Sequence, residues 1–141
     1  MTDYDPQNIF GKILRAEFGS IKVHETDDYL AIMDVFPQSK GHVLVIPKSP
    51  SRNLLDADPA VVARVAAALP GLARAVKSAM NADGLRLMQF NEAPAGQTVF
   101  HLHFHLIPMY SGVELGRHGQ GKADDAELAT QAKAIAAALV S

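Results

Sequence analysis

The sequence predicts an α+β fold whose sheet is mostly antiparallel. Two strand-like segments are separated only by the turn residues 26–28, which indicates a hairpin. Apolar residues at helical spacing mark a long helix in the middle of the chain and another near its end. The 141 residues show no internal repeat and fit the size of one domain. Hairpins on both sides of an inserted helix are typical of the α+β class.

The first half of the chain predicts one short helix and three strands. Residues 1–7 are expected to form a loose arm, and apolar residues at helical spacing then predict a helix over residues 8–16. Alternating or continuous apolar residues predict strands over residues 21–24, 29–33 and 42–46. The third of these is apolar almost throughout and closes at Pro47, as in a strand that is buried on both faces.

The second half predicts a long helix, two strands and a final helix. Asp58 and Pro59 suit the start of a helix, and apolar residues at helical spacing extend it to residue 80. Pro70 predicts a kink or a short break within it. Strands are expected over residues 85–90 and 99–109. A glycine-rich loop follows, and a capping-box pattern at residues 124–127 opens the final helix.

Composition excludes several classes of function. The chain has no cysteine, which excludes disulfides, a thiol nucleophile, iron–sulfur clusters and zinc held by thiolates. Its net charge of −2 and its low aromatic content of 6% argue against a general nucleic-acid binder. No apolar run approaches the ~20 residues that span a bilayer, and the acidic N-terminus is unlike a signal peptide. We therefore expect a cytoplasmic protein with no membrane or nucleic-acid partner.

Three of the six histidines alternate along one predicted strand, at His101, His103 and His105. Alternation puts them on one face of the strand, with Leu102, Phe104 and Leu106 facing the core.

Three interpretations of this pattern compete. The histidines could be polar residues of a half-exposed strand. They could be part of a metal site, but His101 and His105 lie about 13 Å apart along a straight strand, so another ligand such as His42, His24 or a carboxylate would be needed. They could also supply a nucleophile, because a neutral imidazole attacks without help from a strong base at pH 7.

The segment before this strand favours the nucleophile. Gly96 allows backbone N–H groups to approach an anion, and Gln97 and Thr98 are neutral hydrogen-bond donors. Neither a P-loop nor a GxGxxG sequence is present, so the common phosphate cradles are missing.

The sequence HLHFHL at residues 101–106 resembles the signature of the histidine triad (HIT) superfamily, in which histidines alternate with apolar residues. Other segments resemble the same family in the same order, and the resemblance covers residues 8–108. They are NIFGKI at 8–13, AIMDV at 31–35, GHVLVIPK at 41–48, NE at 91–92 and GQTVF at 96–100.

This resemblance implies a fold and an activity. The fold is a five-stranded antiparallel sheet with a long helix, a short N-terminal helix and a C-terminal helix. It forms a single domain over residues 1–141, with a core at about 8–110, and pairs as a homodimer. Family members bind purine nucleotides, and they hydrolyse or transfer nucleoside monophosphates through a covalent nucleotidyl-histidine.

One branch of the family cleaves phosphoramidates, a second hydrolyses diadenosine polyphosphates and a third transfers nucleotides between sugars. The three histidines of this chain are closest to the first branch. The alternatives are a dinucleoside polyphosphate hydrolase, or a nucleotide-binding regulatory module with weak turnover. The resemblance leaves the base preference and the physiological substrate open.

The resemblance also implies residue roles. His103 resembles the nucleophile, His101 a residue beside the phosphate, and His105 a hydrogen-bonding member of the triad. His42 resembles a fourth histidine that relays a proton with the nucleophile. Asp34 resembles the acid that accepts both ribose hydroxyls. The apolar slot for the base is resembled by four residues, Phe10, Ile13, Ile32 and Val35. The residues on the phosphate side are resembled by four more, Asn91, Gly96, Gln97 and Thr98.

The chain departs from the zinc-binding members of the family. Many bacterial relatives hold a structural zinc with two cysteines near the N-terminus and a histidine after the Ile-Pro-Lys sequence. Here the corresponding positions are Asn8, Gly11 and Pro50. We therefore expect no metal site and no cofactor. His24 and His118 match no family motif and are expected to be solvent-facing.

Overall fold

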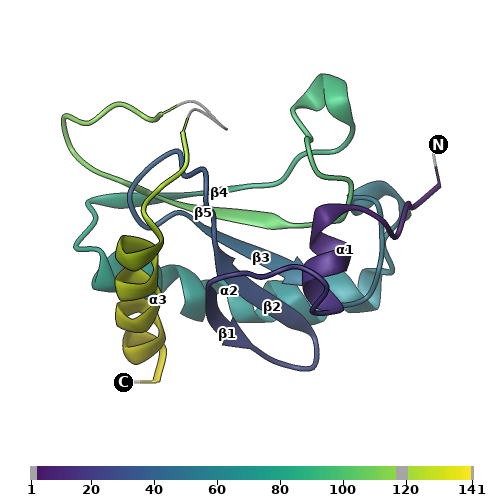
Figure 1. Cartoon of the computed structure of the whole chain (residues 1–141), viewed down its shortest axis with the longest axis horizontal. Helices are drawn as coiled ribbons and strands as arrows, with labels where there is room; N and C mark the ends of the chain where they lie inside the picture. The colour runs from purple at the N-terminus through teal and green to yellow at the C-terminus, as the bar shows by residue number, and fades with distance from the viewer. Residues whose placement is uncertain (1–2, 117–120, 141) are drawn as a thin grey trace.

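The computed structural model describes residues 3–116 and 121–140. The elements follow the predicted order, with helices, strands and two short 3-10 turns arranged as in Figure 1. They are α1 (Ile9–Leu14), β1 (Lys22–Glu25), β2 (Tyr29–Met33), β3 (Val43–Pro47), η1 (Leu54–Asp56), α2 (Pro59–Ala79), β4 (Gly84–Met88), η2 (Ala93–Ala95), β5 (Phe104–Met109) and α3 (Asp125–Val140). The expectation for His118 lies outside the described residues.

The five strands form one sheet in the order β1-β2-β3-β5-β4, and each pair of neighbours is antiparallel. The α+β class and the five-stranded antiparallel sheet are thus confirmed. Strand β5 is last in the chain, yet it lies between β3 and β4. This insertion lays the histidine segment along β3, with His105 opposite Leu44 near the start of β3 and His101 at Pro47, where β3 ends.

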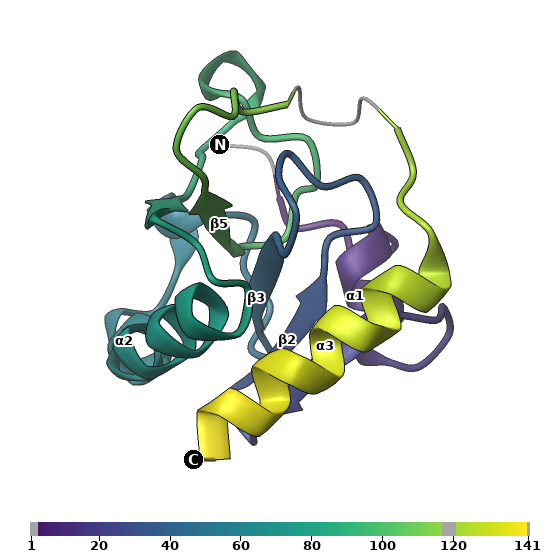
Figure 2. The same cartoon turned by 90° about the vertical axis from the view of Figure 1, so that its left-hand side faces the viewer.

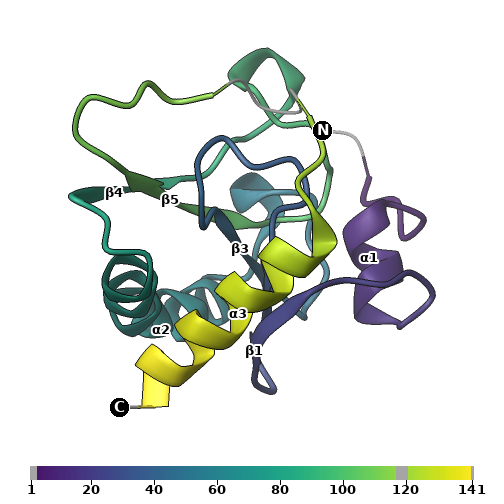
Figure 3. The same cartoon turned by 60° about the vertical axis from the view of Figure 1, so that its left-hand side comes forward.

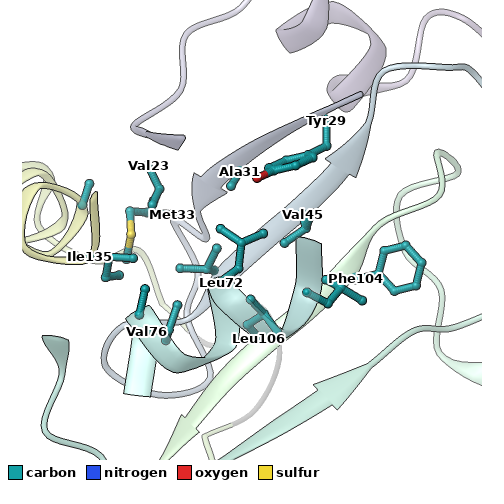
Figure 4. Close-up of a cluster of buried hydrophobic side chains, with 14 of the residues drawn as sticks. Val23, Tyr29, Ala31, Met33, Val45, Leu72, Val76, Phe104, Leu106 and Ile135 are labelled. Atoms are coloured by element: carbon teal, nitrogen blue, oxygen red, sulfur yellow. The ribbon is translucent and has the colours of Figure 1, made fainter. Parts of the chain in front are cut away.

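The two faces of the sheet bury two separate apolar clusters. Ala31 and Met33 of β2 face the larger cluster, which packs against α2 and α3 (Figure 4). Leu30 and Ile32 face the smaller cluster, which includes Phe10 of α1. Figure 3 shows α2 and α3 side by side, with α1 apart from them. Strand β3 is buried at every residue, as its apolar run predicts.

Helix α2 continues through Pro70, so a short break there is wrong, while the alternative of a kink stays a prediction. Proline removes one N–H, which leaves the carbonyl of Ala66 without its helical partner. Both residues are exposed, so water can satisfy that carbonyl. Within the described residues, α2 alone is long and apolar enough to cross a membrane, with a mean hydropathy of 1.4. Core helices meet the same criteria, and here the apolar side of α2 packs on the sheet.

Strand β5 begins at Phe104 rather than at the predicted residue 99. Its partner β3 ends at Pro47, which has no N–H to offer. The N–H of Leu102 instead donates to the carbonyl of Ser51, beyond the end of β3, at 2.9 Å. His101 and His103 therefore precede the regular strand. Their apolar neighbours Leu102, Phe104 and Leu106 reach the larger cluster, as the alternation predicts.

Helix α3 closes the larger cluster. It begins one residue after the predicted cap, and Asp124 accepts a hydrogen bond from the backbone N–H of Glu127 at 3.1 Å. Leu128 and Ile135 are buried against the core, as their spacing predicts. Figure 2 shows α3 lying diagonally across the fold.

Candidate active site

A cavity of about 210 Å³ lies where the end of β4, the start of β5 and the loop before β5 meet. Pockets that enclose a whole small-molecule ligand measure about 300–1,000 Å³, so this cavity fits a reacting group and its immediate neighbours. It is lined by Gln38, Met88, Phe90, Gly96, Gln97, Thr98, His103 and His105. Five of these residues were predicted from the sequence.

His103 lines this cavity, and its hydrogen bonds indicate which ring nitrogen carries the lone pair. Its Nδ1 lies 2.7 Å from the backbone carbonyl oxygen of His101. A carbonyl only accepts, so the proton of the neutral ring lies on Nδ1 and the lone pair lies on Nε2. The ring of Phe10 packs edge-on against His103, with centroids 4.8 Å apart. The ring centroids of His103 and His105 lie 4.9 Å apart.

His42 and His105 form a directed chain of hydrogen bonds. The backbone N–H of Gln38 donates to His42 Nδ1 at 3.1 Å, so the proton of neutral His42 lies on Nε2. His42 Nε2 is 2.9 Å from His105 Nδ1 and donates to it. The proton of neutral His105 therefore lies on Nε2. The result is a fully buried His42 that orients a cavity-lining His105 as a hydrogen-bond donor.

The ring of His101 is held away from the residues that line the cavity. Its Nε2 donates to the carbonyl oxygen of Pro47 at 2.8 Å, and its Nδ1 is 2.7 Å from the hydroxyl of Tyr4. Burial lowers the pKa of His101 below its ordinary value, and the bond to Pro47 offsets this only in part. His101 is therefore neutral near pH 7. The His101 side chain does not line the cavity, and its backbone carbonyl orients His103; its predicted position beside the phosphate stays a prediction.

Asp34 is buried behind His42. One carboxylate oxygen accepts the backbone N–H of Phe36 at 2.8 Å, and the other lies 3.6 Å from His42 Nε2. Asp34 is not among the residues that line the cavity. Its predicted contact with ribose hydroxyls stays a prediction, since each carboxylate oxygen can accept more than one hydrogen bond.

The side chain of Gln97 braces the loop before β5. Its Nε2 donates to the carbonyl oxygens of Arg52 at 2.7 Å and Val99 at 3.0 Å. Its Oε1 accepts the backbone N–H of Glu92 at 2.8 Å and the side-chain amide of Asn53 at 3.1 Å. Two donors and two acceptor sites are the full capacity of an amide. The Gln97 side chain therefore has a structural role, and its predicted role as a phosphate donor stays a prediction.

An ion pair holds the same loop from outside. Arg52 makes two bonds to the carboxylate of Glu92, at 2.8 and 2.9 Å, and its guanidinium lies 4.1 Å from the centre of the Phe100 ring. These bonds from Arg52 hold the pKa of Glu92 below its usual value. Glu92 has a positive φ of 76°, a strained backbone conformation that the surrounding bonds must maintain.

The other predicted phosphate-side residues have different positions. Gly96 lines the cavity with a φ of 107°, and a Cβ there would lie 3.4 Å from the ring of Phe90. Thr98 also lines the cavity and is exposed. The side chain of Asn91 instead accepts the backbone N–H of Leu54 at 2.9 Å and so supports η1.

The predicted apolar slot is divided between the two faces of the sheet. Phe10 and Ile32 belong to the smaller cluster, and Ile13 packs against it. Val35 packs against the larger cluster instead. Phe10 is the member of this group that contacts the triad, through His103.

Asp34, His42 and His105 form a buried group with potential metal ligands within 4.8 Å of one another. His42 would have to ligate through Nε2, but the bond from Gln38 places the proton there. These residues therefore suit proton sharing better than metal ligation. One of the positions that resemble the zinc ligands of bacterial relatives is also unsuited to a larger residue. At this position, Gly11, a Cβ would lie 2.9 Å from the carbonyl oxygen of Pro6.

Several residues of the site were not singled out from the sequence. Gln38 orients His42, Met88 and Phe90 form an apolar wall, and Arg52 holds the loop. The sequence does indicate Gln38 weakly, because it lies four residues before His42 in a loop that contains Pro and Gly. Nothing local marks Tyr4, which lies in the arm that was expected to be loose. His24 packs on β1 near Tyr29 and is half-buried rather than fully exposed.

Comparisons with known proteins agree with this arrangement. The HIT domain matches residues 15–112. The chain is 37% identical over 116 residues to the adenylylsulfatase HINT3 of Arabidopsis thaliana, covering 78% of this chain and 59% of that protein. It therefore spans less than two thirds of the length of that relative.

Two solved structures are similar over almost the whole chain. A Hit-like protein of Bartonella henselae, described as involved in cell-cycle regulation and with an unknown ligand, is 50% identical, with a TM-score of 0.93 and coverage of 97% of this chain and 99% of its own. A zinc-bound histidine triad family protein of Mycobacterium smegmatis is 32% identical, with a TM-score of 0.84 and coverage of 95% and 94%. With the histidine motif and the sheet topology, these matches show that the chain belongs to the HIT family, a superfamily of nucleotide-binding hydrolases.

Proposed function

We propose that this protein cleaves nucleoside phosphoramidates through a covalent nucleotidyl intermediate on His103. One observation carries the proposal. The hydrogen bonds of the site place a lone pair on Nε2 of His103 and a proton on Nε2 of the neighbouring His105. His103 and His105 thus bring a lone pair and a hydrogen-bond donor to one small cavity.

The reaction follows from these protonation states. His103 Nε2 attacks the α-phosphorus, forming a P–N bond as the bond to the leaving nitrogen breaks. The leaving nitrogen accepts a hydrogen bond from His105 Nε2, takes a proton from solvent and departs as a neutral amine, so His105 stays neutral. Water then attacks the nucleotidyl-His103, releases its proton to solvent and gives the nucleoside monophosphate with His103 restored. Two displacements replace one difficult step.

The charges around the cavity favour phosphoramidates over dinucleoside polyphosphates. Within residues 3–116 and 121–140, no lysine or arginine lines the cavity. Arg52 is paired with Glu92, and Lys48 with Glu25. A leaving polyphosphate would gain negative charge beside the apolar side chains of Met88 and Phe90, whereas a leaving amine is neutral. The named activity of the Arabidopsis relative makes adenylyl sulfate a further substrate to compare.

The test is a steady-state assay across four compounds. Adenosine phosphoramidate, diadenosine polyphosphate, adenylyl sulfate and adenosine monophosphate are compared at equal concentrations, with binding measured by calorimetry. We expect the highest kcat/KM for the phosphoramidate. A higher value for diadenosine polyphosphate would overturn the substrate class. Nucleotide binding without any turnover would favour a regulatory module instead.

We also expect the protein to need no zinc, unlike the zinc-bound relative. Tetrahedral zinc sites use cysteine, histidine or carboxylate ligands, and Asn8, Gly11 and Pro50 supply none of these. Elemental analysis should find well under one zinc per chain, and turnover should survive a chelator. Stoichiometric zinc, or activity that a chelator removes and zinc restores, would contradict this expectation.

The exposed edge of the sheet supports a homodimer. β4 is an edge strand, and its Leu87 is 54% exposed. Pairing of such an edge covers unpaired backbone groups. Sedimentation at micromolar concentration should give a species of twice the 15.1 kDa chain mass. Leu87→Glu should weaken it, while Leu55→Glu, at an exposed residue of η1, should not. A wild-type monomer would refute the assembly.

A further inference from the structure

The N-terminal arm reaches the triad through one side chain, Tyr4. Its hydroxyl lies 2.7 Å from His101 Nδ1, and the two rings meet edge to face with centroids 5.5 Å apart. The HIT domain match begins at residue 15, so Tyr4 lies outside it.

The direction of this hydrogen bond follows from the other side of the His101 ring. The carbonyl oxygen of Pro47 only accepts, so Nε2 of His101 must carry the proton. Nδ1 then holds the lone pair, and the Tyr4 hydroxyl donates to it. His101 has no exposed surface, so without Tyr4 this nitrogen would lack a described partner in a place that water does not reach. A buried acceptor without a partner is costly.

The arm is built to bring Tyr4 to this place. Asn8 ties back to Asp5, with its side-chain amide 2.7 Å from the Asp5 carbonyl oxygen. Gly11 of α1 lets the arm pack closely, because a Cβ there would lie 3.2 Å from the Tyr4 hydroxyl. Tyr4 thus rests on α1 on one side and on His101 on the other.

His101 passes this restraint to the nucleophile. The side chain of His101 is held at both ring nitrogens, by Tyr4 and by Pro47, while its backbone carbonyl accepts the Nδ1 proton of His103. Any shift of residue 101 would therefore move the group that sets the tautomer and the orientation of the His103 ring.

We propose that Tyr4 is a positioning residue of the active site, which acts through His101 to hold His103 Nε2 ready for attack. This inference rests on the proposed function. It gives the N-terminal arm a role in turnover, although Tyr4 does not line the cavity.

The test is Tyr4→Phe, which keeps the ring and removes the donor. We expect kcat to fall about tenfold with KM nearly unchanged, at the lower end of the roughly 10–100-fold cost of losing the outer hydrogen-bond partner of a metal-ligating histidine. The matched control is Tyr110→Phe, because the Tyr110 hydroxyl also donates a hydrogen bond, in its case to the backbone carbonyl of Lys40 at 2.6 Å. The control should keep wild-type kcat.

Nitrogen NMR of the nucleotide-free protein tests the contact without any substrate. The Nδ1 resonance of His101 should move in Tyr4→Phe and stay in place in Tyr110→Phe. Tyr4→Phe should remain folded at the assay temperature, with a lower melting temperature because a buried acceptor loses its donor. An unchanged His101 resonance, or equal kcat in wild type and Tyr4→Phe, would overturn the proposal. A wild-type protein that cleaves none of the four compounds would refute the proposed function instead, and the NMR result would still report on the Tyr4 contact.

Discussion

His103→Ala should form no covalent intermediate and lose roughly 10⁴-fold or more in kcat, as removal of a catalytic nucleophile does elsewhere. The lone pair on Nε2 of His103 is the attacking group, and alanine offers none. Nucleotide binding should change little, because Gly96 and Thr98 line the cavity independently of this ring. The measurement is trapping with a labelled phosphoramidate, followed by peptide mass mapping, with binding measured in parallel.

The control for this experiment is His24→Ala. His24 lies on β1 near Tyr29 and is not part of the cavity, so its removal should leave trapping and turnover intact. An adduct on His101, His42 or Lys48 of the wild-type protein would overturn the assignment of the nucleophile. Full activity of His103→Ala would overturn the mechanism.

Gln97→Ala should destabilise the protein and also impair turnover. The substitution removes the partners of two backbone carbonyls, of the N–H of Glu92 and of the Asn53 amide. We expect the free energy of unfolding to fall by about 2–3 kcal/mol, because one buried polar group left unpaired costs ~1–3 kcal/mol. Since the same loop carries Gly96 and Thr98 into the cavity, kcat/KM should fall roughly tenfold or more, as small misplacements at a site do.

Chemical denaturation and steady-state kinetics on the same variant separate two roles of Gln97. If Gln97 only contacts the phosphate, Gln97→Ala will have a lower kcat/KM and an unchanged free energy of unfolding. That result would contradict the structural role of Gln97. Thr98→Ala is the matched control, since Thr98 lines the cavity but is exposed. Its unfolding free energy should stay within about 0.5 kcal/mol of wild type, as for most exposed positions.

The sequence was sufficient to predict the order of the elements, the bounds of β2 and the division of β3 between two buried faces. A continuous apolar run is a local property, so it identifies β3 as buried on both faces without knowledge of the partners. The sequence also identified the histidines that meet at the cavity, because the HIT motif lies in one contiguous segment. Gly96 and Thr98, which were predicted to bind the phosphate, line the cavity as expected, because they lie in a short segment just before that motif.

Only the tertiary structure decided how those local pieces are used. The insertion of β5 between β3 and β4, the start of β5 at Phe104 and the orientation of the His101 ring all depend on partners that are distant in the chain. Tyr4 and His101 are 97 positions apart, and Gln97 lies 45 positions from Arg52. Periodicity over a few residues carries no information about such pairs. Hydrogen-bond capacity is the physical reason that they form, since each buried donor or acceptor takes whatever partner the fold brings within reach.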